Sequence, residues 1–274
     1  MKKPMVFLLA FLIADLLISV CLFWGRAEAA DDPAAREIMR KVEDRDDGDH
    51  RTHSMLMELI DKNGAVRKKQ FSIFTKDYGP DTRQIMFIES PASVRNTGFL
   101  TFDYGDEEKD DDQWLYLPAL GKPKRIATGD KDGSFMGSDL NYSDMTSRNL
   151  IDYDFKLIKE TTLKGVRVWL IQSIPRSEEV VDETGYKKSI LAVRQDNHVV
   201  SKIKAWTAEG GYVKIMDFDD IRLIDGIWTP LEIRVSKRLG KTVKHKTRIS
   251  IRDVKFNQSL SDDLFTLRRL GKGL

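Results

Sequence analysis

The sequence contains almost no cysteine: Cys21 is the only one among its 274 residues. Cys21 lies in an N-terminal segment that we expect to be removed during export, so the mature chain has no thiol. A chain without thiols forms no disulfide, builds no thiolate metal site and offers no cysteine nucleophile. Its stability must come from its core alone, and a chain of this length can bury enough apolar surface for that.

An excess of charge of one sign is lacking as well. Lysine and arginine number 45 against 43 aspartates and glutamates, which gives a net charge of +2. Nucleic-acid-binding domains usually carry a clear positive excess, so this balance excludes nucleic acid as a partner by bulk charge. Charged residues at 32% and hydrophobic residues at 41% are typical of a globular protein.

Familiar catalytic motifs are also missing. The chain has no Gly-x-Ser-x-Gly elbow, no glycine-rich phosphate loop and no His-Glu-x-x-His pair. Only His50 and His53 are neighbours among its four histidines, and both fall in a charged stretch where we expect solvated side chains and no bound metal. The sequence therefore predicts a protein that is not an enzyme and needs no metal or cofactor.

Residues 106–112 hold six carboxylates in a run of seven residues. Carboxylate oxygens are the ligands that calcium prefers, but the run lacks the glycine and the regular spacing of a dedicated calcium loop. It falls between two expected strands, over residues 98–104 and 113–117. We therefore expect a solvated hairpin tip rather than a metal site.

The first residues are typical of a secretory signal. Two lysines precede an apolar run over residues 5–24, and the small-x-small sequence Ala27-Glu28-Ala29 follows it. We expect cleavage after Ala29, which leaves one exported β domain over residues 30–274.

Two other fates of this segment stay open. The apolar run is about as long as the roughly 20 residues that cross a bilayer, so it could remain as an N-terminal anchor. Asp15 lies near the middle of the run and disfavours an anchor, because a charged side chain is unfavourable inside a bilayer. Lipidation of Cys21 is the other alternative, and Val20 disfavours it because a small residue is preferred at that position.

A short amphipathic helix is predicted over residues 33–42. Asp31-Asp32-Pro33 supplies an acidic start and a first-turn proline, and apolar side chains from Ala35 to Val42 recur on one face. Nearly everything after this helix is predicted to be strand.

The strands are predicted from alternation and turn signals. Residues 55–60 and 66–75 flank Asn63-Gly64, the strongest short hairpin signal. Further short strands are expected over residues 84–89, 98–104 and 113–117. Later turns fall at Asp196-Asn197, Gly210-Gly211, Asp225-Gly226 and Leu239-Gly240. The pattern predicts a mainly β protein, a strongly curved antiparallel sheet of about eleven strands with two helical pieces over one face.

Residues 126–149 interrupt this pattern because they show no period-two alternation. We predict a short helix that starts at Ser138 or Asp139 and runs to about Arg148. Phe135 and Met136 are large apolar residues between glycines, which suggests a lid that can swing. A packed loop that plugs one end of the sheet is the alternative.

Several expected strands carry large, adaptable hydrophobic side chains on one face. A curved sheet of this size can enclose more volume than its own side chains fill, and methionine suits an adaptable apolar site. The candidate cavity and lid residues are Met55, Met57, Leu59, Phe71, Ile73, Phe99, Trp114, Tyr116, Phe135 and Met136. An ordinary packed core is the competing interpretation of the same pattern.

Four segments resemble the bacterial outer membrane lipoprotein-sorting protein group, which is similar to the periplasmic lipoprotein carriers LolA and LolB. They are residues 90–100, 112–126 (Asp-Gln-Trp-Leu-Tyr-Leu-Pro-Ala-Leu-Gly-Lys-Pro-Lys-Arg-Ile), 133–139 and 263–265. The resemblance implies an unclosed β-barrel with a lid over an apolar cavity for acyl chains, in a Gram-negative periplasm. It also implies a possible RND-type inner-membrane exporter as partner.

Three functions are compatible with these observations. The first is a carrier of lipid or lipoprotein acyl chains in outer-membrane trafficking. The second is a non-enzymatic accessory subunit of an RND-type exporter, contacting it through residues 106–112 or through basic residues on a strand edge. Those basic residues are Lys237, Arg238, Lys241, Lys244 and Lys246. The third is a lipid-active enzyme using Ser134 or Ser138 with a distant His198 or His245.

Overall fold

The computed structural model describes residues 31–274. The expected signal, its cleavage after Ala29 and the lone Cys21 therefore lie outside the described residues. No helix within 31–274 is long and apolar enough to cross a membrane.

All strands of the described chain belong to one antiparallel sheet of thirteen strands that does not close. The strands are β1 (His50–Ile60), β2 (Val66–Tyr78), β3 (Asp81–Ser90), β4 (Gly98–Asp103), β5 (Asp112–Tyr116), β6 (Pro123–Arg125), β7 (Tyr153–Leu163), β8 (Val166–Pro175), β9 (Tyr186–Arg194), β10 (Val200–Thr207), β11 (Tyr212–Ile224), β12 (Ile227–Leu239) and β13 (Thr242–Phe256). The expected fold class is confirmed, with thirteen strands in place of about eleven.

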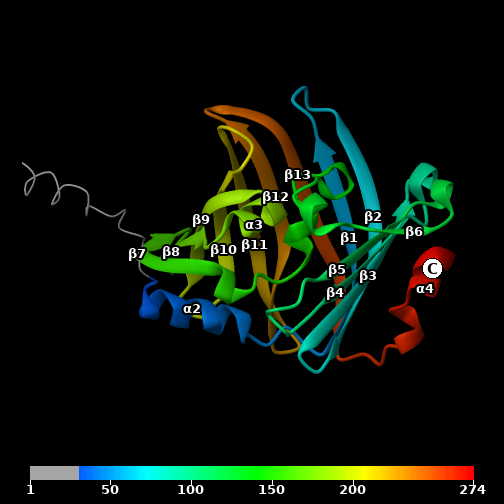
Figure 1. The fold of residues 1–274 in the computed structure, drawn as a ribbon, viewed down its shortest axis with the longest axis horizontal. Coiled ribbons are helices and arrows are strands. Elements are labelled where there is room, and N and C mark those ends of the chain that lie inside the picture. Colours follow the sequence, from blue (N-terminus) through cyan, green and yellow to red (C-terminus); the bar gives the residue numbers. More distant parts are fainter. Residues whose placement is uncertain (1–30) are drawn as a thin grey trace, which may run out of the picture.

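The helices are short and lie around the sheet. They are α2 (Pro33–Glu43), α3 (Glu178–Thr184) and α4 (Leu267–Lys272), with the single 3-10 turns η1 (Ala92–Val94), η2 (Pro118–Leu120), η3 (Thr128–Asp130), η4 (Phe135–Gly137), η5 (Tyr142–Met145), η6 (Leu150–Asp152) and η7 (Asp262–Leu264). Figure 1 shows α4 outside the strands β3 to β6, and α2 beside β7 and β8.

The strand order explains the long irregular segment. The order β6-β5-β4-β3-β2-β1-β13-β12-β11-β10-β9-β8-β7 makes two meanders, which join where β1 pairs with β13. β6 and β7 are consecutive in the chain but lie at opposite edges of the sheet. Residues 126–152 must therefore cross the whole sheet, and they do so over one face, which we call the inner face (Figure 1).

Local hydrogen bonds and turn residues form the predicted connections between strands. Asp61 accepts the backbone N–H groups of Asn63 (2.8 Å) and Ala65 (3.0 Å), which closes the β1–β2 turn around Gly64 at φ 85°. The turns predicted at Asp196-Asn197, Gly210-Gly211, Asp225-Gly226 and Leu239-Gly240 all separate paired strands.

The predicted N-terminal helix is confirmed as α2. Asp32 caps it by accepting the N–H groups of Ala34 and Ala35, and Pro33 occupies the first turn. Asp31 and Asp32 also accept N–H groups of β7, from Phe155 (2.9 Å) and Leu157 (3.2 Å). The start of the described chain is thereby fixed to the β7 edge.

Candidate functional site

The inner face carries an apolar cavity of about 320 Å³ beneath the crossing segment. Strands from both meanders line it, and Phe135, Leu140 and Met145 of the crossing segment cover it. The apolar lining from the strands is Met55, Met57, Ile73, Met86, Ile203, Met216, Phe218, Ile233, Ile249 and Ile251. We call this space the methionine cavity.

A second cavity of about 310 Å³ adjoins the first. Met39 and Val42 of α2 form one wall, and apolar residues of β7 and β9 such as Phe155 and Leu191 form another. Ile203 and Arg148 line both cavities. The inner face therefore holds two neighbouring apolar spaces, one under the crossing segment and one under α2.

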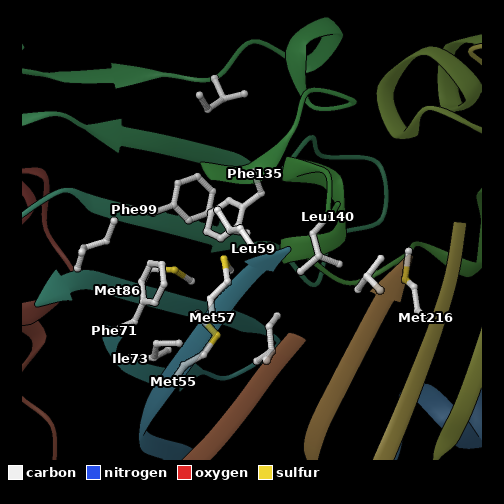
Figure 2. Packing of buried hydrophobic residues seen from close by; sticks show 14 of the residues in the cluster. Met55, Met57, Leu59, Phe71, Ile73, Met86, Phe99, Phe135, Leu140 and Met216 are labelled. Carbon is white, nitrogen blue, oxygen red and sulfur yellow. The ribbon is translucent and has the colours of Figure 1, made fainter. Parts of the chain in front are cut away.

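One end of the inner face is filled by aromatic packing. The ring of Phe135 lies 5.2 Å from that of Phe99 and 5.7 Å from that of Tyr142, centroid to centroid. Figure 2 shows Phe135 and Leu140 facing the side chains of Phe99, Met57 and Leu59. This cluster is ordinary close-packed core.

The candidate residues from the sequence divide accordingly. Met55, Met57, Ile73 and Phe135 line the methionine cavity. Leu59, Phe71 and Phe99 are fully buried in the adjacent core and do not line it.

Trp114 and Tyr116 lie on the other face of the sheet. They pack with Phe265 and Leu270, beneath α4. On β5 it is Gln113 and Leu115 that turn toward the crossing segment: Gln113 donates to the carbonyl of Tyr142, and Leu115 packs against the inner core. Trp114 and Tyr116 are therefore not cavity residues, because the register of β5 assigns them to the outer face.

The crossing segment is fastened to the sheet rather than free to swing. Lys214 of β11 donates to Asn141 Oδ1 (2.5 Å) and to the Tyr186 hydroxyl (3.1 Å), and that hydroxyl donates to Asp144 (2.8 Å). Lys214 is only 4% exposed. We call Asn141, Asp144, Tyr186 and Lys214 the buried network.

Two further contacts hold the same segment. Asp139 Oδ2 accepts the hydroxyl of Thr247 (2.7 Å) and lies 2.8 Å from His245 Nδ1. Lys69 donates to the carbonyl of Met136 (2.8 Å). Phe135 is 1% exposed and Met136 half-buried, so both belong to a packed cover, and the structure agrees with the alternative of a packed segment rather than with the expected swinging lid.

The helix predicted from Ser138 or Asp139 to Arg148 does not form. Within that range the chain forms the single 3-10 turn η5, which is capped by Asn141 and Asp144. The polar side chains Asp139, Asn141 and Asp144 bond to the sheet instead of solvating a helix surface.

Polar side chains line the methionine cavity toward the start of β1. Arg51 and His53 share the inner face with Met55 and Met57, and Arg148 comes from the end of the crossing segment. The sequence interpretation missed them because it placed His53 in a solvated linker. His50 and His53 belong to β1, and burial lowers the pKa of His53 to about 3, so its imidazole is neutral.

The acidic run 106–112 is a mainly exposed turn between β4 and β5 that also contacts the crossing segment. The Glu107 carbonyl accepts a hydrogen bond from the side-chain amide of Asn149, and the Asp110 carboxylate accepts one from the hydroxyl of Thr128. Burial first, and then the Asp103 carboxylate, raise the pKa of Asp111 to about 6. Within residues 31–274, no group of three metal-ligating side chains gathers at one place.

The remaining candidates occupy separate places. Ser134 donates to the Ser138 carbonyl (2.6 Å), His198 stacks on Trp169, and His245 faces Asp139, so within the described chain neither serine bonds to a histidine. The basic residues Lys237, Arg238, Lys241, Lys244 and Lys246 gather on the β12–β13 hairpin, the first two at the end of β12.

Comparison with solved structures finds proteins with the same architecture. A DUF1329 family protein from Desulfovibrio piger superposes with a TM-score of 0.80 at 26% identity, over 88% of this chain and 100% of that one. A protein described as a putative outer membrane lipoprotein-sorting protein domain, from Vibrio parahaemolyticus, gives 0.78 at 24% identity, over 87% and 98%. A LolA superfamily protein from Nitrosomonas europaea gives 0.62 at 20% identity, over 85% and 97%.

No curated protein matches the sequence. A family model with the description "Uncharacterized protein" matches residues 80–272, most of the chain. The resemblance to the lipoprotein-sorting group is confirmed by the shared fold. The chain belongs to the family that this model defines, and it has the open β-barrel fold of the outer membrane lipoprotein-sorting and LolA-superfamily proteins.

Proposed function

We propose that this protein is a periplasmic carrier that binds the acyl chains of a lipid or lipoprotein. The observation that carries the proposal is the methionine cavity, an apolar space of about 320 Å³ that the side chains of a thirteen-stranded sheet leave unfilled. Its size lies within the range of about 300–1,000 Å³ that is usual for ligand sites. The adjoining cavity under α2 extends the apolar surface.

Apolar burial alone supplies enough affinity for such a cargo. Each CH₂ group removed from water contributes about 0.8 kcal/mol, so a single long acyl chain can bind without any catalytic group. Methionine and isoleucine form most of the apolar part of the lining. The flexible methionines accommodate chains of different shape, which suits a carrier better than a site for one rigid ligand.

The export signal expected from the sequence supports the periplasmic setting. A carrier that crosses an aqueous compartment needs a covered apolar site, and the packed segment 126–149 provides that cover. Release then requires a change in this cover or a competing partner, because a ligand shifts an equilibrium only by its difference in affinity for the two states.

Native mass spectrometry of the protein purified from its host tests the proposal. We expect a co-purifying lipid, and uptake of a fluorescent fatty acid by the delipidated protein. Ile251→Trp, which fills the cavity, is expected to reduce uptake strongly. The matched control Ile158→Trp changes an exposed isoleucine of β7 and is expected to leave uptake unchanged. Absence of any bound lipid together with no uptake would refute the carrier function.

An RND-type exporter is proposed as the membrane partner on a separate observation. Basic side chains gather near the turn of the β12–β13 hairpin, where none of them lines the methionine cavity, and such a patch suits contact with an acidic surface. Lys241→Glu with Lys244→Glu is expected to abolish recovery of the exporter in a pull-down from host membranes. Equal recovery by the wild type and the double variant would contradict this contact.

A further inference from the structure

The inner face of β1 changes character along its length. Side chains two residues apart share a face of a strand, so Leu59, Met57 and Met55 are followed by His53 and Arg51 on the same face. Met57, Met55, His53 and Arg51 all line the methionine cavity. The cavity therefore has an apolar end and a polar end, and β1 runs through both.

Arg51 lacks a counter-charge in contact. Within residues 31–274 no carboxylate lies within 4.0 Å of its guanidinium, and its Nε makes no hydrogen bond although it is shielded from solvent. Asp47 and Asp77 attract it from a distance, Arg45 repels it, and burial lowers its pKa. An unpaired charge in a poorly solvated place is unfavourable unless something compensates it.

Arg148 adds a second guanidinium to the same cavity. It lies over the rings of Tyr186 (5.6 Å) and Tyr153 (6.0 Å), and its Nη1 makes one long hydrogen bond, of 3.3 Å, to Ser189 Oγ. Among the described residues it too has no carboxylate within ion-pair distance. It also lines the cavity under α2, so it stands where the two apolar spaces meet.

The other polar groups at this end leave the two cations available. His53 is neutral, and its Nδ1 has no hydrogen-bond partner among residues 31–274. Asp144 lines the cavity, but its carboxylate already accepts the Tyr186 hydroxyl and the Asn141 N–H. Glu43 and Asp47 line the second cavity together with Arg148, but among the described residues neither carboxylate lies within 4.0 Å of the Arg51 or Arg148 guanidinium.

We propose that the cargo is an amphiphile with an anionic head, a carboxylate or a phosphate, whose chain lies on the methionine and isoleucine lining while its head is bound by Arg51 and Arg148. This inference rests on the carrier function proposed above and names the chemical class of the cargo. Guanidinium groups bind carboxylates and phosphates through paired, charge-assisted hydrogen bonds, which are stronger than hydrogen bonds between neutral groups.

Three probes of equal chain length distinguish binding of the head group from binding of the acyl chain. They are hexadecanoate, hexadecyl phosphate and hexadecanol. Each is measured by displacement of the neutral dye Nile red from the delipidated full-length protein. The wild type is expected to bind both anions at least about tenfold more tightly than the alcohol. The better of the two anions identifies the head group as carboxylate or phosphate.

Arg51→Met and Arg148→Met are each expected to remove most of this preference while leaving the affinity for hexadecanol unchanged. Arg222→Met is the matched control, since Arg222 is exposed and paired with Asp220, and it is expected to keep the preference. Arg51→Met is also expected to leave the melting temperature equal or higher, because an unpaired charge is removed.

Equal affinity of the wild type for the alcohol and both anions would overturn the anionic-head proposal while the carrier function stands. Failure of all three probes to bind would overturn the carrier function and this inference with it. A preference retained in both arginine variants would show that these side chains do not bind the head.

Discussion

The Lys214 ammonium lies 2.5 Å from Asn141 Oδ1, and this contact joins β11 to the segment that crosses the inner face. Lys214 is also shielded from bulk water, being 4% exposed, and its charge is balanced by Asp144 at 4.0 Å. The cover of the methionine cavity is thus held by a polar contact that is sealed from solvent.

Lys214→Met is expected to loosen this cover. The substitution keeps the length of the side chain but removes the donor to Asn141 and Tyr186 and the counter-charge of Asp144, so we expect a loss of about 2–4 kcal/mol in the free energy of unfolding. Urea denaturation measures the loss, and amide exchange over residues 126–149 is expected to accelerate. Lys204→Met, at an exposed position on the neighbouring strand β10, serves as the control. Unchanged exchange in the Lys214 variant would contradict the fastening role.

Phe135→Ala is expected to lower the free energy of unfolding by about 3–5 kcal/mol, because it removes a fully buried ring that packs on Phe99 and Tyr142. Met136→Ala, at a half-buried neighbour, is expected to cost much less. Chemical denaturation of both variants provides the comparison. Similar losses for the two would mean that the segment is not anchored through Phe135.

His53 makes stability depend on pH. Its pKa is lowered from 6.5 to about 3 in the folded protein, so the unfolded chain binds more protons between these values. Stability is therefore expected to fall as the pH falls from about 6.5 toward 3. His53→Gln is expected to show a shallower fall in a pH series of urea denaturation curves. Identical pH slopes for wild type and variant would rule out the buried neutral imidazole.

Asp111 has the opposite effect. Its pKa is raised from 3.8 to about 6, by burial and by Asp103, so the folded protein binds more protons than the unfolded chain between these values. This carboxyl therefore lowers stability progressively as the pH rises from about 4 to 6. Asp111→Asn retains an oxygen to accept the Tyr104 N–H and is expected to remove that contribution. The melting temperature of the variant relative to that of the wild type is therefore expected to be higher at pH 7 than at pH 4, as thermal unfolding at the two pH values measures; an equal difference at both would contradict the raised pKa of Asp111.

Local signals in the sequence were sufficient for the β character and for the positions of several turns. Asn63-Gly64 and the four later turn dipeptides all separate paired strands, because turn conformations depend on a few adjacent residues. α3 was missed although its signals were present: Ser177 caps its start, and Gly185 ends it at φ 74°.

Non-local relationships could not be predicted in the same way. The pairing of β1 with β13 decides that residues 126–152 cross the inner face, and no residue in that segment reveals it. Both faces of β3 and β4 are buried, one under the crossing segment and one under α4, so alternation on the neighbouring β5 did not reveal which way Trp114 points.

The candidate site was predicted in its apolar half only. Met55 and Met57 stand out by alternation, whereas Arg51 and His53 look like linker residues because a strand face that turns from apolar to polar shows no hydrophobic period. Their role becomes visible only when β1 is seen to begin at His50 and to continue the same face.

An open sheet has two borders where backbone groups are unpaired, and these invite a second chain to add a strand. β6 ends one border with only three residues. The long border strand β7 is interrupted by an irregularity in its pairing between Leu157 and Lys159 and carries charged side chains such as Lys156 and Glu160. Near its start, the backbone N–H groups of Phe155 and Leu157 already donate hydrogen bonds to the carboxylates of Asp31 and Asp32. Such borders resist strand-by-strand polymerisation, so the molecule can keep its barrel open without becoming a template for aggregation.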